Sequence, residues 1–435
     1  MKTLLILIML ILYNDSVIAQ DLTLGLRIND LKVHPMQPLS KPAYLKTTID
    51  PSFNTTIRRI TNTSAGGIIA PMYSTIQPWN ADESFMIVYE VGKGHHLLNG
   101  QNYTFIRMLN AVTPDDIEQL FWDFKNPDWL YYVNKSSGEL IRYSISSREK
   151  KIIINLKATV NCTDISLGGD VQMPSRDGMI FAFRCGNNKA YYYNQSSNKI
   201  IEFEINDLNY TAPMPGPSGT LFYHNKNIYG QNGKLIRTLD LGNGSGHACL
   251  GQLANGNDAY YSVVFSAEGC QGNIVAHDMV TGACLPIISE GLGYAYSKTG
   301  THISALAHQN NESGWIAASM IGYDGDGQKL LDQELIIANS NPNNPIVCRI
   351  AHHRSDEDNL GFDYWGEPHA AISPSGTRVL FGSDWSGPED GKSIDSYVVE
   401  LPVHQNELSI SNFTKIQTVL SPNPFSERTT LTIQN

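Results

Sequence analysis

Polar turns followed by apolar strands recur along most of the chain. Asn80–Ser84 precedes Phe85–Tyr89, and Ser373–Gly376 precedes Thr377–Ser383. Strands that are covered on both faces lose the strict alternation of a half-exposed strand and show nearly continuous apolar runs of this kind. The repeat has a length of about 50 residues, which is typical of four-stranded propeller blades. The pattern therefore predicts an all-β protein, a seven-bladed β-propeller.

The repeats also predict how the chain is divided. We expect the seven blades within residues 51–402, with the fourth, near Pro213–Tyr223, the least regular. A strand within Asp50–Thr61 is expected to close the ring by pairing with the last blade. Residues 20–50 contain several prolines and no clear period, which predicts an arm lying over the propeller. Residues 403–435 are expected to form a linker and a tail outside the propeller.

The first residues have the pattern of an export signal. Met1-Lys-Thr is followed by an apolar run, Leu4–Tyr13, and then by Val17 and Ala19, which suit cleavage after Ala19. We therefore expect residues 1–19 to be removed and the mature protein to be secreted or held at the cell surface. No later apolar stretch is long enough to span a membrane, so no transmembrane segment is expected.

The tail carries a recognisable segment. Leu420-Ser-Pro-Asn-Pro-Phe precedes a Thr-rich stretch that ends at Ile433. This segment resembles the opening of the C-terminal sorting domain of the Bacteroidetes type IX secretion system, in which Ser-Pro-Asn-Pro-Phe leads into a Thr-rich strand. The resemblance implies that type IX secretion machinery is a partner of the tail.

Charge and cysteine content narrow the class further. The chain carries 31 Lys and Arg against 42 Asp and Glu, a net charge of −11. Such a charge gives no general attraction to nucleic acid, so no nucleic-acid partner is expected. The six cysteines can form disulfides in an oxidising compartment. Cys162 can pair with Cys185, and Cys249 with Cys270 or Cys284, while buried free thiols are the alternative.

Three histidines fall at the same place in their repeats. His247, His302 and His369 each open the predicted innermost strand of a blade. Innermost strands run along the central channel, so their first residues lie at one mouth of it. Neutral imidazoles bind divalent metals and act as acids or bases. We therefore expect a functional site at this mouth. The alternative is that each His satisfies a buried carbonyl group or a water.

The last repeat contains His369-Ala-Ala-Ile-Ser-Pro-Ser-Gly, followed by a strand that ends at Ser383. The segment resembles the Ser-Pro-Asp-Gly strand pair of TolB-like and oligogalacturonate-lyase-like propellers. In the second family a His just before the turn helps to hold a divalent metal. His369 matches that position, and His302 matches a second metal-binding His. The resemblance implies a divalent cofactor such as Mn, Ca or Zn. This chain departs from the family at Ala371, where a further His is usual, and at Glu367, near the usual Gln.

Four further residues are candidates for binding and catalysis. Gln77 would add hydrogen bonds at the channel mouth, and Trp122 and Trp385 would stack on sugar rings. Core packing is the alternative for both tryptophans. Arg349 lies in a basic cluster that can pair with a uronate carboxylate, and a solvated loop is its alternative.

Two classes of function follow. No nucleophile elbow, P-loop or dinucleotide fingerprint occurs in a suitable context, which disfavours serine hydrolysis and cofactor redox chemistry. The first class is a secreted enzyme acting on acidic polysaccharide or oligosaccharide, namely a lyase. In it, His247 and Arg349 would be catalytic, and His302 and His369 would bind the metal. The alternative is a non-catalytic propeller that binds glycan or protein at the cell surface.

Overall fold

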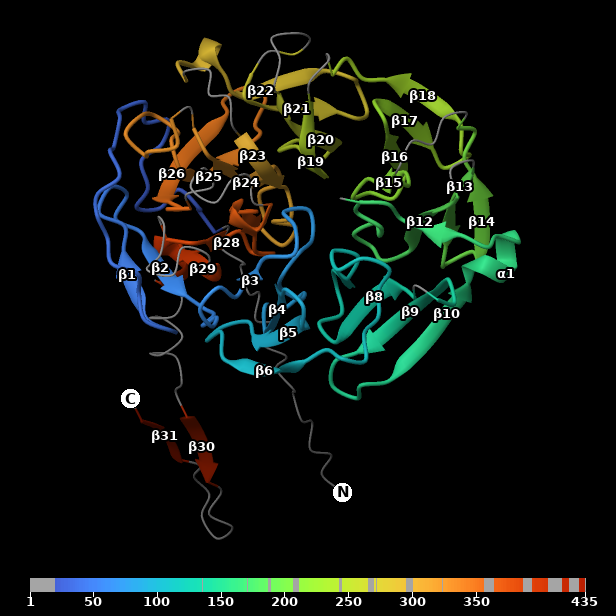
Figure 1. Ribbon diagram of the computed structural model, residues 1–435, viewed down its shortest axis with the longest axis horizontal. Helices are drawn as coiled ribbons and strands as arrows, with labels where there is room; N and C mark the ends of the chain where they lie inside the picture. The colour runs from blue at the N-terminus through green and yellow to red at the C-terminus, as the bar shows by residue number, and fades with distance from the viewer. Residues whose placement is uncertain are drawn as a thin grey trace, which may run out of the picture.

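Seven antiparallel sheets are arranged as a ring in the computed structural model of this protein (Figure 1). Six of these sheets have four strands and the seventh has five. The fold is therefore a seven-bladed β-propeller, which confirms the predicted class. The structure describes residues 20–134, 136–169, 171–186, 189–205, 211–241, 245–264, 270, 272–294, 300–322, 324–355, 364–385, 393–405, 417–421 and 430–434. The predicted export signal, residues 1–19, lies outside the described residues.

Blades one to six are meanders in which consecutive strands pair, from the centre of the ring to its rim (Figure 1). The strands of blades one to three are β3 (Ile69–Ala70), β4 (Phe85–Glu90), β5 (Gly94–Asn99), β6 (Phe105–Met108), β7 (Phe121–Trp122), β8 (Trp129–Val133), β9 (Glu139–Ser144), β10 (Lys150–Asn155), β11 (Ile165–Ser166), β12 (Ile180–Cys185), β13 (Lys189–Asn194) and β14 (Lys199–Glu202). Those of blades four to six are β15 (Met214–Pro215), β16 (Leu221–His224), β17 (Asn227–Gly230), β18 (Leu235–Thr238), β19 (Ser245–Gln252), β20 (Asp258–Val264), β21 (Ile274–Asp278), β22 (Cys284–Ile288), β23 (Gly300–Ser304), β24 (Trp315–Met320), β25 (Glu334–Asn339) and β26 (Ile346–His352).

Blade seven joins the two ends of the ring. Its strands, from the centre outward, are β27 (Ala371–Ile372), β28 (Arg378–Ser383), β29 (Asp395–Glu400), β2 (Thr56–Arg59) and β1 (Thr47–Ile49). The predicted closing strand is confirmed, because β2 pairs antiparallel with β29. The Arg58 guanidinium strengthens this closure with a bidentate ion pair to Glu400, at 2.6 and 3.1 Å.

Short helices and a hairpin complete the described elements. They are α1 (Leu156–Val160), η1 (Glu290–Leu292), η2 (Tyr364–Gly366), β30 (Gln417–Ser421) and β31 (Thr430–Gln434). The last two strands pair with each other in a sheet of their own. No helix within the described ranges is long and apolar enough to cross a membrane.

The core lies between neighbouring blades. Every residue of β24, β25, β28 and β29 is buried. Adjacent blades cover both faces of such strands, which is why their sequences read as apolar runs rather than as alternating ones.

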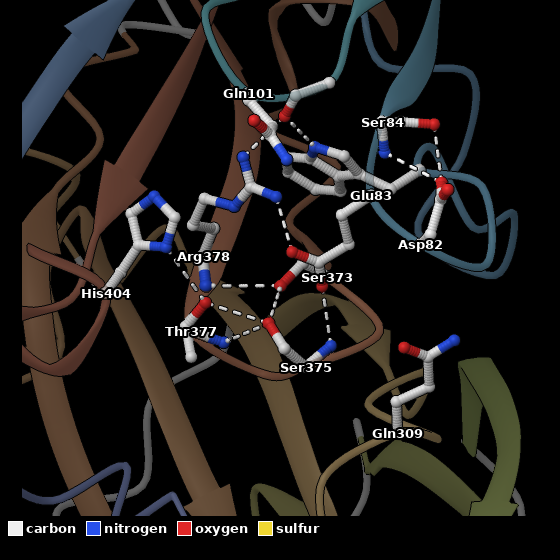
Figure 2. Close-up of polar contacts among 12 residues, drawn as sticks. Asp82, Glu83, Ser84, Gln101, Gln309, Ser373, Ser375, Thr377, Arg378 and His404 are labelled. Carbon is white, nitrogen blue, oxygen red and sulfur yellow. Dashed lines mark hydrogen bonds and ion pairs between the residues drawn. The ribbon is translucent and has the colours of Figure 1, made fainter. Parts of the chain in front are cut away.

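A buried ion pair joins blade seven to blade one, the last blade of the ring to the first (Figure 2). The Arg378 side chain, 1% exposed, donates to the Glu83 carboxylate, to the Gly100 carbonyl and, at 3.1 Å, to the Tyr103 hydroxyl. The Ser375 amide donates to the other Glu83 oxygen at 2.7 Å. The Arg378 guanidinium, which belongs to blade seven, thus has three acceptors in blade one.

The residues before β1 lie along blades six and seven. Leu22 is fully buried against Gly376, where an added Cβ atom would lie 2.6 Å from a Leu22 methyl group. Asn29 extends the edge of β26, because its amide donates to the Val347 carbonyl at 2.8 Å and its side chain accepts from the Val347 amide at 2.8 Å. These contacts hold the segment against the outer edge of blade six and the turn between β27 and β28 of blade seven.

Two disulfides lie within single blades or beside them. The predicted Cys162–Cys185 pair is confirmed, with Cα atoms 5.9 Å apart. The second disulfide joins Cys270 to Cys284, so the predicted pairing of Cys249 with one of them is wrong. Cys249 lies in the innermost strand β19, whereas Cys284 begins the outermost strand β22. The Cys249 thiol is buried and accepts a hydrogen bond from the amide of Ala305 at 3.2 Å.

Candidate functional site

The innermost strands β19 and β23 and the residues just before β27 bring His247, His302 and His369 together, and we call these residues the His cluster. The rings of His247 and His302 are stacked with centroids 4.6 Å apart. The rings of His302 and His369 follow at 4.1 Å. Tyr73 from blade one packs against the last two, at 5.0 and 5.3 Å. The same slot of three consecutive blades therefore supplies three imidazoles to one place.

The backbone is irregular at each of these positions. His247 and His369 have φ angles of 47° and 45°, in the left-handed region that few non-glycine residues adopt. The pairing register of β19 shifts between Gly246 and Cys249, and that of β23 shifts between Gly300 and His302. Bulges and left-handed residues re-aim side chains and are enriched at functional sites. Here they turn all three imidazoles toward one another.

The inner members of the cluster are held neutral. His302 and His369 are buried, whereas His247 is exposed. Burial, together with the neighbouring imidazoles His369 and His247, places the pKa of His302 well below its ordinary value. Burial lowers the pKa of His369 to about 4, although its hydrogen bond to Tyr364 opposes that change. Neutral imidazoles keep a lone pair available for a metal.

Glu367 adds a carboxylate to the cluster. Its Oε2 atom lies 3.3 Å from Nδ1 of His302, which is an ion-pair distance. The hydrogen-bond geometry is not met, because Nδ1 of His302 is a buried atom without a hydrogen-bond partner in the described residues. Burial raises the pKa of Glu367 to about 7. Glu367 and His302 are therefore close but not hydrogen-bonded to each other, as expected of two ligands that face a common cation.

The fit to a divalent cation rests on two further observations. One ligand atom each from His247, His302 and Glu367 lies within 4.8 Å of the other two. The Nε2 atom of His369 lies 3.0 Å from the Tyr364 carbonyl, while its Nδ1 is buried with no hydrogen-bond partner in the described residues. A ring that donates one N–H to a carbonyl and presents the other nitrogen is the usual arrangement of a metal-binding His. Nitrogen and carboxylate donors suit Zn and Mn better than Ca.

Gln77 and Trp122 lie in the channel but do not line the His cluster. Gln77 donates to the carbonyls of Leu306 and Ile372, in blades six and seven, at 3.2 and 3.0 Å. The Trp122 indole donates to the Pro78 carbonyl at 3.0 Å. Both side chains line a cavity of about 20 Å³, room for roughly one water molecule. They fill the channel and tie blades together there.

Arg349 and Trp385 both donate hydrogen bonds to residues that precede β1. Arg349 belongs to β26, the outermost strand of blade six, and pairs with the buried Glu334 at 2.9 Å. Trp385 stacks on Tyr397 at 4.8 Å, and its indole donates to the Leu39 carbonyl at 2.9 Å. The structure therefore gives both side chains partners within the protein.

Tyr73 and Glu118 are neighbours of the cluster that sequence reasoning missed, and Tyr364 is a third neighbour. Tyr364 packs on His369 at 4.7 Å, and its hydroxyl donates to the Glu118 carboxylate from blade two. The sequence offers Tyr364 as a possible base for an elimination, although no local motif singles it out. Tyr73 and Glu118 are distant in sequence and carry no local signal.

Comparisons with known proteins support the propeller class. No protein family and no curated protein sequence shows significant similarity to this chain. Among solved structures, an oligogalacturonate lyase from Vibrio parahaemolyticus is similar, with 13% identity and a TM-score of 0.60, covering 82% of this chain and 96% of that one. An oligogalacturonate lyase in complex with manganese is similar with 14% identity and a TM-score of 0.56, over the same shares of the two chains. At this identity the likeness shows the fold.

Proposed function

We propose that this protein is a metal-dependent lyase that cleaves uronate-containing oligosaccharides by β-elimination at the His cluster. The convergence of three imidazoles and the Glu367 carboxylate carries the proposal. The similarity to oligogalacturonate lyases, one of them in complex with manganese, agrees with it. The alternative, a propeller that only binds glycan or protein, gives no role to Nδ1 of His302 and Nδ1 of His369, which are buried and have no hydrogen-bond partner among the described residues.

His302 and Glu367, two of the three residues whose ligand atoms lie within 4.8 Å of one another, would hold the metal with His369 as a further ligand, and the third, His247, is left as the base. His302, His369 and Glu367 are all buried, and Nδ1 of His302 and Nδ1 of His369 have no hydrogen-bond partner in the part of the chain that the structure describes. A divalent cation bound there would neutralise a uronate carboxylate and so acidify the neighbouring C5 proton. Arg349 is not part of this proposal, because Glu334 already pairs with it.

His247 is the proposed base. It is the exposed member of the cluster, and its ring lies beside the buried ligands. Its neutral imidazole takes the C5 proton, the electrons of that bond form the C4–C5 double bond, and the C4–O bond breaks. The leaving oxygen takes a proton from water. The products are a shortened saccharide and an unsaturated uronate.

Three variants separate these roles. His302→Ala and Glu367→Gln should lose bound metal, measured by elemental analysis of purified protein. His247→Ala should retain the metal and form no unsaturated uronate. Loss of metal in His247→Ala would contradict the assignment of His247 as base and make it a ligand.

We further propose that the protein is exported by residues 1–19 and delivered through type IX machinery by its tail. The support is the sequence pattern at the two ends. N-terminal sequencing of protein recovered from the periplasm or medium should begin near Gln20. Protein that is soluble in the cytoplasm and retains Met1 would contradict export.

A further inference from the structure

Aromatic rings continue from the His cluster toward blade one. The ring centroid of Tyr364 lies 4.7 Å from that of His369, and the ring centroid of Trp365 lies 5.1 Å from that of Tyr364. The indole of Trp365 then stacks on Tyr89 of β4 at 5.9 Å, with an angle of 19° between the ring planes. Three aromatic side chains thus extend outward from the edge of the proposed site.

Contacts within the protein hold these rings in place. Tyr364 and Trp365 belong to η2, and the Tyr364 hydroxyl donates to Glu118. Tyr89 packs on His95 at 5.2 Å, and Nε2 of His95 lies 2.7 Å from the Ile117 carbonyl. Because the side chains are already ordered, little conformational entropy remains to be lost when a ligand binds them.

Exposure distinguishes this group from the other tryptophans near the channel. Trp79 and Trp122 are buried, with 0% and 2% of their surface exposed. Tyr364 is 36% exposed, and Trp365 and Tyr89 are partly exposed. Partly exposed rings beside a polar site suit ligands with both apolar and polar faces, and a sugar ring presents its C–H bonds on one face.

We propose that Tyr364, Trp365 and Tyr89 form an aromatic subsite that binds the C–H face of the sugar residue next to the one at the His cluster. The inference rests on the proposed function, since it takes the bound ligand to be an oligosaccharide. A carboxylate on this neighbouring sugar residue must point away from the Glu118 carboxylate beside Tyr364. The subsite therefore recognises a sugar by its ring, and the uronate carboxylate lies at the metal end.

The experiment compares ligands of two lengths. Binding of galacturonate and of trigalacturonate is measured by calorimetry in a His247→Ala background, in which the proposed base is absent and the ligand is not consumed. Trp365→Ala should weaken trigalacturonate binding about tenfold and leave galacturonate binding unchanged. Trp365→Phe, which keeps a flat ring, should lose less. Trp129→Ala serves as control, because Trp129 lies in β8 against Arg142, with the guanidinium 3.8 Å from the ring centroid.

Folding is checked by the melting temperature of each variant. If Trp365→Ala is destabilised, Tyr89→Leu carries the test, because it keeps apolar volume and loses the flat ring. Unchanged trigalacturonate binding in a folded variant would overturn the subsite. An equal loss for both ligands would also overturn it, because that result means damage to the His cluster. The subsite would also be overturned if the His247→Ala protein itself bound no trigalacturonate.

The outcome for the proposed function is read separately. Wild-type protein is incubated with trigalacturonate, and unsaturated uronate is measured. If unsaturated uronate forms and Trp365→Ala does not change trigalacturonate binding, the aromatic subsite is refuted and the lyase is not. Binding that depends on Trp365 without product refutes the lyase and retains a binding site.

Discussion

Removing the charge of Glu83 should destabilise the propeller at the seam between its first and last blades. Arg378 is 1% exposed and Glu83 is 14% exposed, and their side chains form an ion pair (Figure 2). Glu83→Gln keeps the size of the side chain but leaves the buried guanidinium without a counter-charge. Breaking a buried pair in this way costs about 3–5 kcal/mol of unfolding free energy. The remaining acceptors, Gly100 and Tyr103, place the expected loss near the lower end.

Urea denaturation followed by tryptophan fluorescence measures this loss. The matched control is Glu202→Gln, since the Lys189–Glu202 pair is about half exposed and should contribute almost nothing. In the double variant Glu83→Gln/Arg378→Met, the cost should be less than the sum of the two single costs, because the stranded charge is gone. A loss below about 1 kcal/mol in Glu83→Gln would refute the reasoning.

The same pair predicts a pH dependence. Burial alone would raise the pKa of Glu83, but the charge of Arg378 and the hydrogen bond from Ser375 hold it below its ordinary value of 4.5. A carboxyl group with a lowered folded pKa contributes stability above its unfolded pKa, and this contribution is lost as the pH falls through the folded value. The wild type should therefore lose more stability below pH 4.5 than Glu83→Gln does.

Three further outcomes are expected. Manganese affinity should weaken as the pH falls below about 7, because Glu367 must lose its proton to bind the ion, and Glu367→Gln should bind more weakly but with a flatter pH profile in metal titrations. The double variant Cys162→Ser/Cys185→Ser should lose about 3 kcal/mol in urea denaturation, since the disulfide closes a loop across a sequence separation of 23; an unchanged midpoint would contradict this. Deletion of Ser421–Asn435 should leave the melting temperature almost unchanged, because β30 and β31 pair with each other in a sheet of their own; a large drop would mean that the tail supports the propeller.

The fold was predictable because its signal is local and repeated. A polar turn and a buried strand recur in each blade, and the closing strand β2 lies within Asp50–Thr61 as expected. The His cluster was predictable for the same reason. One slot of a repeated unit defines one place in the ring, so His247, His302 and His369 meet.

The remaining features depend on contacts between distant parts of the chain. Arg349 and Trp385 look available in sequence, but the residues that precede β1 cover them, and Leu39 accepts the Trp385 indole hydrogen bond. Glu118 reaches Tyr364 across 246 positions of the sequence. The pH sensitivity of the site also changes with burial. An ordinary imidazole titrates near pH 6.5, whereas burial lowers the pKa of His369 to about 4. Burial raises the pKa of Glu367 to about 7, so the change of charge near pH 7 is expected at Glu367 rather than at His369.

The most direct test of the central claim is the absorbance of unsaturated uronate, followed while purified protein is incubated with a panel of acidic polysaccharides and their oligosaccharides. The account predicts product with at least one uronate-containing substrate, loss of that product on treatment with a chelator, and its return when manganese is added. The triple variant of His247, His302 and His369 to Ala should form none. Protein that contains no metal, forms no unsaturated product from any substrate and behaves like the triple variant would contradict the lyase and leave only a binding propeller.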